Sequence, residues 1–155
     1  MNKIIRLLPL TLLLVLLSVS CSKSNDDPGP DITVPTIEFT KPNADGTTSY
    51  TRGLPMDLNA TFKDDRALSK CIVTITYTEE SPKTVLKGIG SPWAPAELGD
   101  QFTIDFTGEK EKVVSVDLFD DPIEAACLGG KYTLKFVVTD KTGNELTKLV
   151  DVTLQ

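Results

Sequence analysis

The sequence predicts an all-β fold in which seven strands form a sandwich of two sheets. Two observations support this fold class. Apolar residues in the body of the chain recur at every second position, which is typical of strands buried on one face. Loops rich in glycine, proline and aspartate separate these segments, and several short strands joined by such turns favour a β-sandwich.

Seven segments after the first thirty residues carry the strand pattern. They span residues 32–39, 54–62, 71–77, 102–106, 114–118, 132–138 and 150–154. In the second segment the even-numbered residues form the apolar face: Leu54, Met56, Leu58, Ala60 and Phe62. In the fifth segment the same role falls to Val114, Val116 and Leu118. No stretch of the body has a clear helical stripe apart from a possible short turn at 122–127.

The first segment is irregular. Ile37 and Phe39 are out of phase with Ile32 and Val34, and Pro35 stands at the change. Proline cannot donate a hydrogen bond to a neighbouring strand, so this position suits an edge strand that kinks or changes sheets.

The last two segments carry two local signals. Tyr132 stands at the start of the sixth segment, after Gly129 and Gly130, where a tyrosine corner belongs. In that motif the tyrosine hydroxyl bonds to backbone a few residues upstream. Residues 140–144 then form a tight hairpin turn in which Gly143 can adopt a positive φ.

Four short motifs give the chain a family resemblance. They are Asp31-Pro35-Ile37, Gly53-Leu58, Phe62-Asp64-Asp65 and Tyr132-Leu134-Asp140-Gly143-Asn144. In these motifs the sequence resembles the bacterial immunoglobulin-like modules of surface proteins, and more closely a family of uncharacterised Bacteroidota lipoproteins with one such domain. The resemblance implies an immunoglobulin-like (fibronectin III-like) sandwich over residues 32–155.

The chain begins with the pattern of a secretory signal. Lys3 and Arg6 precede an apolar run at 7–17, which is shorter than the roughly 20 residues of a membrane-spanning helix. The run leads through small residues to Cys21 and resembles a lipoprotein signal, although Ser18 stands where that family prefers leucine. The resemblance implies a signal peptide at 1–20 and a lipid on Cys21. An ordinary signal peptide with an incidental thiol is the alternative.

Residues 21–31 are predicted to form a flexible, acidic linker, because they contain too few apolar groups to fold. Asp26 and Asp27 after Lys23 resemble the export tag of surface-displayed lipoproteins. Two or more acyl chains hold a protein stably on a membrane. We therefore expect an outer-membrane lipoprotein that faces the cell surface, or alternatively the periplasm.

The charge of the chain argues against one class of partner. The whole sequence has 16 basic and 22 acidic residues, for a net charge of −6. Removal of the signal peptide takes away two basic residues and lowers the charge further. Nucleic-acid binding needs clustered Lys and Arg to displace counterions, so we expect no nucleic-acid partner.

Cys71 and Cys127 are the other two cysteines, and export makes a disulfide between them conceivable. The inferred strand order places them at opposite ends of the sandwich, about 20 Å apart along one strand. A disulfide needs Cα atoms within about 7 Å. We therefore expect two free, buried thiols, with the Cys71–Cys127 bridge as the alternative.

Two loops at the same end carry oxygen-rich residues: Asp64 and Asp65 in one, Asp140 and Asn144 in the other. They could converge on Ca²⁺, which takes 6–8 oxygen ligands. Asp and Asn also cap turns through their own backbone, and this role needs no metal. The sequence predicts no cofactor, with calcium as the alternative.

The long connection at 78–100 is a candidate binding region, because long loops on a rigid scaffold often carry function. The candidate ligand contacts are Trp93, Lys87 and the preceding Tyr77. An exposed Trp93 could stack on a sugar ring or fill a partner's pocket. Alternatively, its ring closes the open edge of the core.

Enzyme functions lack support in the sequence. The chain has no histidine, hence no usual triad base and no histidine-ligated zinc, and it has no Gly-x-Ser-x-Gly motif. We predict a non-catalytic surface lipoprotein whose immunoglobulin-like domain serves adhesion or glycan capture. The alternatives are a structural subunit of an envelope or fimbria-like assembly, and a small hydrolase without a recognised motif.

Overall fold

Eight β-strands build the part of the chain that the computed structural model describes, namely residues 29–78, 90–95 and 101–155. They are β1 (Thr36–Lys41), β2 (Ser49–Tyr50), β3 (Met56–Lys63), β4 (Leu68–Tyr77), β5 (Gln101–Asp105), β6 (Glu111–Leu118), β7 (Gly130–Asp140) and β8 (Glu145–Leu154). The all-β prediction is confirmed, and the predicted count of seven strands is wrong by one. The signal peptide, Cys21 and Lys87 lie outside the described residues.

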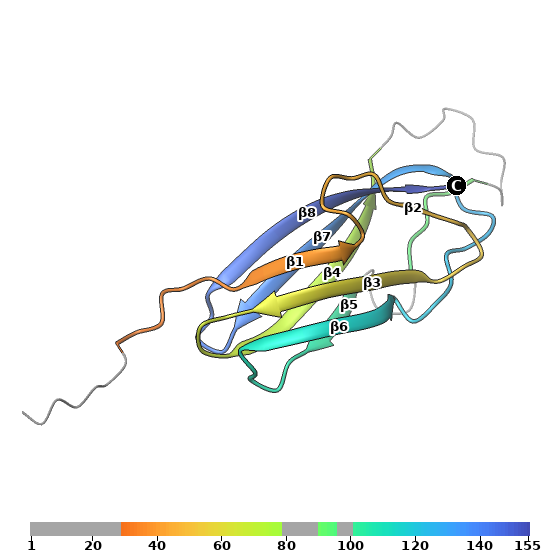
Figure 1. Cartoon of the computed structure of the whole chain (residues 1–155). Helices are drawn as coiled ribbons and strands as arrows, with labels where there is room; N and C mark the ends of the chain where they lie inside the picture. Colours follow the sequence, from red (N-terminus) through yellow and green to blue (C-terminus); the bar gives the residue numbers. More distant parts are fainter. Residues whose placement is uncertain (1–28, 79–89, 96–100) are drawn as a thin grey trace, which may run out of the picture. The chain divides into compact units, whose positions relative to one another are not determined.

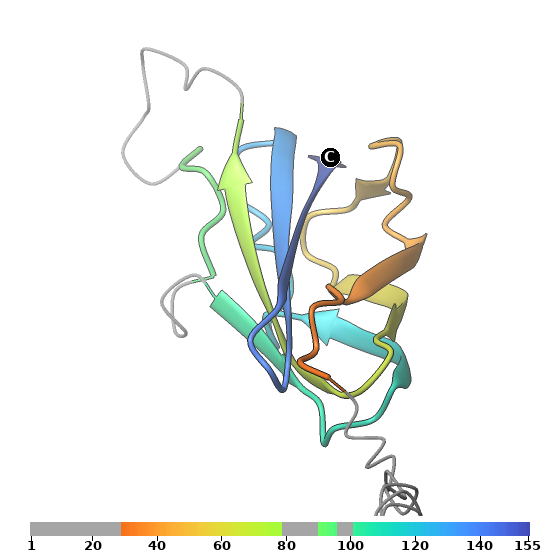
Figure 2. The ribbon, with the colours of Figure 1, turned by 90° about the vertical axis from the view of Figure 1, so that its left-hand side faces the viewer.

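The strands form two sheets that face each other (Figures 1 and 2). One sheet has three strands in the order β1-β3-β6, and the other has five in the order β2-β8-β7-β4-β5. Neighbouring strands are antiparallel except for β2 and β8. All eight strands belong to one compact unit, Asp31–Gln155. Within the described residues, no helix combines the length and hydropathy that a membrane crossing requires.

The strand that the sequence did not reveal is β2. Its two residues, Ser49 and Tyr50, pair in parallel with Thr153 and Leu154 at the end of β8. Two residues are too few to show an alternation, so the pattern that predicts strands cannot detect them. Tyr50 is nevertheless a core residue, and its hydroxyl donates a 2.7 Å hydrogen bond to the carbonyl of Asp57.

The core follows the predicted alternation in most strands. β3 is the clearest example, because every second residue from Met56 to Phe62 is buried. In the second and fifth predicted segments, one member of each apolar face is exposed. Leu54 is 56% exposed because it lies in the turn before β3, and Val116 is partly exposed on the edge strand β6.

The first strand begins later than predicted. Ile32 is 83% exposed and Val34 is also exposed, whereas Ile37 and Phe39 turn towards the core. β1 starts immediately after Pro35, which has no amide proton and restricts the backbone of the residue before it. The predicted change of phase at this proline therefore marks the start of the strand.

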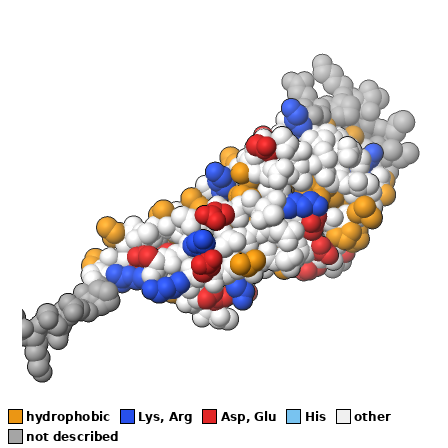
Figure 3. All heavy atoms as spheres, in the orientation of Figure 1, with side chains coloured by type: hydrophobic (Ala, Val, Ile, Leu, Met, Phe, Trp, Pro, Cys, Tyr) orange, Lys and Arg blue, Asp and Glu red, His pale blue; other side chains and the backbone are white. Residues whose placement is uncertain are grey.

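The outer face of the three-stranded sheet is covered by interspersed charges (Figure 3). Lys63 on β3 lies between Glu38 on β1 and Glu111 on β6, at 3.8 and 3.7 Å. Such exposed pairs contribute at most about 1 kcal/mol each, and they maintain solubility more than stability.

Tyr132 forms the predicted tyrosine corner. Its hydroxyl donates a 2.7 Å hydrogen bond to the carbonyl of Leu128, four residues upstream. The same hydroxyl accepts a 3.0 Å hydrogen bond from the backbone N–H of Trp93. Burial raises the pKa of Tyr132 to about 12, so the hydroxyl keeps its proton for the bond to Leu128. One side chain thus ties two connecting segments to β7.

We predict that Tyr132→Phe lowers the free energy of unfolding by about 2 kcal/mol, because the partly buried carbonyl of Leu128 and the buried N–H of Trp93 each lose their partner. Urea denaturation measures this change. Thr76→Val removes an exposed hydroxyl from β4 and serves as the control, with an expected change within about 0.5 kcal/mol. Equal stability of the Phe variant and the wild type would contradict the role assigned to this hydroxyl.

Candidate functional site

Trp93, the first predicted ligand contact, belongs to the core. Only 5% of the residue is exposed, and its ring meets Phe119 edge-on with the centroids 5.4 Å apart. Phe119 follows the buried Leu118 directly, and its positive φ of 68° breaks the strand alternation so that both side chains turn inward. Of the two roles that the sequence left open for Trp93, the structure shows the one in which the ring closes the core, and not the exposed stacking surface.

The other two predicted ligand contacts are Tyr77 and Lys87. Tyr77 is half-buried, and its ring packs against Tyr132 at 5.0 Å between centroids. Lys87 lies outside the described residues. Trp93 thus lies in the core and Tyr77 packs against it, whereas the predicted role of Lys87 stays a prediction.

A different surface hollow, of about 380 Å³, lies beside β2 and the start of β3. Lys41 forms an ion pair with Asp57 there at 2.5 Å, and its ammonium lies 5.1 Å from the centre of the Tyr50 ring. Leu54 and Asp117 also line the hollow. Sequence reasoning missed it, because it depends on β2, which the pattern does not show.

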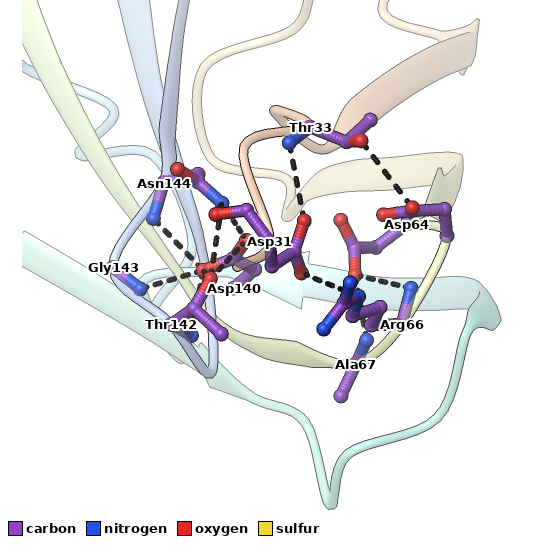
Figure 4. A network of polar contacts seen from close by, with 10 residues as sticks. Asp31, Thr33, Asp64, Arg66, Ala67, Asp140, Thr142, Gly143 and Asn144 are labelled. Carbon is purple, nitrogen blue, oxygen red and sulfur yellow. Dashed lines mark hydrogen bonds and ion pairs between the residues drawn. The ribbon is translucent and has the colours of Figure 1, made fainter. Parts of the chain in front are cut away.

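The turn between β7 and β8 is organised by the carboxylate of Asp140 (Figure 4). One oxygen, Oδ1, accepts hydrogen bonds from the backbone N–H groups of Thr142, Gly143 and Asn144 at 2.6–2.8 Å. The other, Oδ2, accepts from the amide of Asn144 at 2.7 Å and from the hydroxyl of Thr142. Burial acts to raise the pKa of Asp140, but the hydrogen bonds from Asn144 and Thr142 outweigh it and lower the pKa.

Asp64 organises the turn between β3 and β4 in a similar way. Its Oδ1 accepts from the backbone N–H groups of Arg66 and Ala67, at 2.9 and 2.6 Å (Figure 4). Asp64 and Asp140 thus perform the turn-capping role that the sequence offered as the alternative to metal binding. Asp140 and Asn144 satisfy each other within their own turn, so the predicted four-residue calcium set is not the cluster that the structure forms.

The acids that do come together are Asp31, Asp64 and Asp65. One carboxylate oxygen of each lies within 4.8 Å of those of the other two. The sequence assigned Asp31 to the linker, whereas the compact unit begins at this residue and only 1% of its side chain is exposed. Its Oδ1 accepts from the backbone N–H of Thr33, and its Oδ2 lies 3.8 Å from Nε of Arg66. The motif Asp31-Pro35-Ile37 singled out this aspartate, but its place at the end of a polar segment led to its assignment to the linker.

The two body cysteines are free, buried thiols at different places in the fold. Cys71 pairs with Val138 in the register of the five-stranded sheet. Cys127 lies before β7, and its carbonyl accepts a hydrogen bond from Arg52 at 2.6 Å. Burial raises the pKa of Cys71 to about 12 and also raises that of Cys127, so both thiols stay protonated and weakly nucleophilic.

A comparison with known protein families identifies the family of this chain. A family model described as "Domain of unknown function (DUF4625)" matches residues 19–155. The chain belongs to this family. No curated protein matches the DUF4625 chain.

One solved structure that resembles the DUF4625 chain is an AA10 lytic polysaccharide monooxygenase (LPMO) from Streptomyces lividans. The two share 18% sequence identity with a TM-score of 0.42. The match covers 69% of this chain and 58% of the other. A likeness at this level says nothing about catalysis.

We predict that Asp140→Ala lowers the free energy of unfolding by about 2–3 kcal/mol at pH 7, because three backbone donors lose a charged acceptor. The folded pKa of Asp140 is lowered, so its contribution is complete above the unfolded value of about 3.9 and disappears as the pH falls through the folded value. Urea denaturation should therefore show the wild type and the variant converging in acid. Glu145→Ala, an exposed acid at the start of β8, is the control.

We predict that a chain starting at residue 22 resists maleimide alkylation while folded. In concentrated guanidinium chloride without reductant it should take up two maleimides, at Cys71 and Cys127. Mass spectrometry measures both numbers. If alkylation of the unfolded chain requires a reductant, the two residues form a disulfide and their assignment as free thiols is wrong.

Proposed function

We propose that this protein is a non-catalytic module, held by lipid on the outer membrane and displayed at the cell surface, that binds a protein or glycan ligand. The observation that carries the proposal is the stretch LLSVSCSKSNDD (16–27), which leads into a self-contained β-sandwich. An apolar run, a cysteine and a polar linker in that order suit a cleaved and acylated anchor followed by a tether. The family alone assigns no activity.

The anchor follows from the energetics of lipid insertion. Each buried methylene contributes about 0.8 kcal/mol, and stable attachment takes more than one acyl chain. A lipid on Cys21 therefore holds the sandwich at the membrane without any spanning segment. The acidic residues after Cys21 favour display on the outer face.

The proposal of a non-catalytic module is supported by the burial and hydrogen bonding of the carboxylates and thiols in the described domain. The chain has no histidine, and the carboxylate of Asp140 is used in its own turn. The thiols of Cys71 and Cys127 are buried and protonated. Nucleophiles and bases at active sites are instead exposed in clefts with pKa values near the working pH.

A binding role is supported by the described surface. The hollow beside β2 combines a charged pair, Lys41 and Asp57, with the apolar side chain of Leu54. Sites of this size and mixed character suit a small ligand or a side chain of a partner. The interspersed charges of Figure 3 suit such partners better than a strongly charged polymer.

We predict that the wild-type chain, expressed in a host with a lipoprotein pathway, incorporates radiolabelled palmitate and partitions with outer membranes. Cys21→Ala should lose both properties, because it lacks the sulfur that carries the lipid. Cys127→Ala is the matched control and should keep the label. Equal labelling of Cys21→Ala, or membrane association without the label, would overturn the anchor.

Ligand class is tested with the soluble chain from residue 22, on glycan and host-matrix arrays and in pull-downs from outer membranes. Binding to an array component that weakens in Lys41→Glu supports the surface-binding module and the hollow beside β2. Capture of a single envelope protein in place of an array ligand would favour the structural-subunit alternative.

A further inference from the structure

Two separate segments bring three carboxylates together at one end of the sandwich. Asp31 is the first residue of the compact unit, and Asp64 and Asp65 follow the end of β3. The group is tight, since one oxygen from each residue lies within 4.8 Å of the others. We propose that Asp31, Asp64 and Asp65 form a Ca²⁺-binding site.

The strongest support is the pairing of the oxygens. Asp64 is 8% exposed, and its Oδ1 is engaged by the backbone of its own turn. Its Oδ2 is buried, and no hydrogen-bond donor among the described residues reaches it. The Oδ2 of Asp31 is likewise buried without a hydrogen bond from the described residues, and Nε of Arg66 lies 3.8 Å from it. Leaving a buried charged oxygen without a partner is costly, so a cation between these oxygens satisfies a need of the fold.

The charges of the cluster match a divalent ion. The three carboxylates carry −3 when ionised, and Arg66 contributes +1 next to Asp31. These four groups leave −2 in a small volume. A divalent cation neutralises this charge of −2, which remains after the charge of Arg66 has been counted.

The chemistry and spacing favour calcium. All three donors are hard carboxylate oxygens, and neither of the buried thiols belongs to the group. Two oxygens bound to one Ca²⁺ at about 2.4 Å can lie up to about 4.8 Å apart, and the oxygens of this cluster all lie within that distance of one another. Mg²⁺ binds at about 2.1 Å and demands a regular octahedron, for which ligands from a turn and a distant segment are poorly suited.

Asp140 and Asn144 stand outside the site, although they lie close to it. The amide of Asn144 donates a 3.2 Å hydrogen bond to the carbonyl of Asp31, so the β7–β8 turn supports the backbone of one ligand (Figure 4). The oxygens of Asp140 are already occupied by N–H and O–H donors. Bound calcium would thus tie residue 31, where the compact unit starts, to the turn between β3 and β4.

The test uses the soluble chain from residue 22, which retains the whole compact unit, after removal of metal with a chelator. We expect calorimetric titration with CaCl₂ to give one site with a Kd of about 0.1–1 mM, the range of extracellular calcium modules. At ten times Kd, the melting temperature should rise by about 4 °C or more. NaCl at equal ionic strength should not reproduce this rise.

Two variants locate the site. Asp65→Asn changes an exposed ligand and should lose both the heat of binding and the shift in melting temperature. Asp105→Asn removes the same charge from an exposed position at the end of β5 and should keep both. The proposal is overturned if the wild type shows neither signal at millimolar Ca²⁺, or if Asp65→Asn responds like the wild type. An equal rise with MgCl₂ would overturn the assignment to calcium.

Discussion

Strand β7 is the constraint on which the rest of the structure depends. It lies in the middle of the five-stranded sheet, between β4 and β8, and one face of it is fully buried. The residues of that face are Tyr132, Leu134, Phe136 and Val138. A slip of one residue in its pairing would turn this apolar row outward, so its burial sets the register of both neighbours.

The same strand also organises both ends of the sandwich. At its start, the Tyr132 hydroxyl holds Leu128 and the segment that carries Trp93. At its end, the Asp140 carboxylate shapes the turn into β8 and positions Asn144, whose amide reaches Asp31. The two polar groups work differently. Tyr132 stabilises a closed, apolar end, whereas Asp140 stabilises an end rich in charge.

The parts of this fold that the sequence predicts are those with a local or periodic signature. The alternation in β3 and β7 follows from burial of one face, and Tyr132 and Gly143 stand at fixed offsets from strand ends. The parts it does not predict depend on distant partners. β2 exists only because β8 offers it an edge, and the choice between a buried and an exposed Trp93, which the sequence left open, depends on Phe119 turning inward through a positive φ. Neither condition is visible in the neighbouring residues.

The carboxylates show the same limit at the level of the site. Sequence reasoning grouped Asp64 and Asp65 with Asp140 and Asn144, because both pairs end strands at the same end of the sandwich. It offered turn capping as an alternative for these residues but could not decide between the two roles for Asp140, and it did not predict that Asp31 packs into the fold. Which acids remain available to a ligand depends on how the backbone N–H groups of each turn are oriented.

The contrast between these aspartates separates a structural carboxylate from one that needs a partner. The charge of Asp140 is stabilised by several donors inside one short turn, so its pKa is lowered and it needs nothing further. Asp64 has donors for one oxygen only, and its other oxygen faces burial without a hydrogen bond from the described residues. Two aspartates at the same end of the fold therefore have different roles. Asp140 closes a turn, whereas Asp64 presents a negative charge. That difference arises from the backbone around each aspartate, which is why it favours a cation at Asp31, Asp64 and Asp65 over one at Asp140.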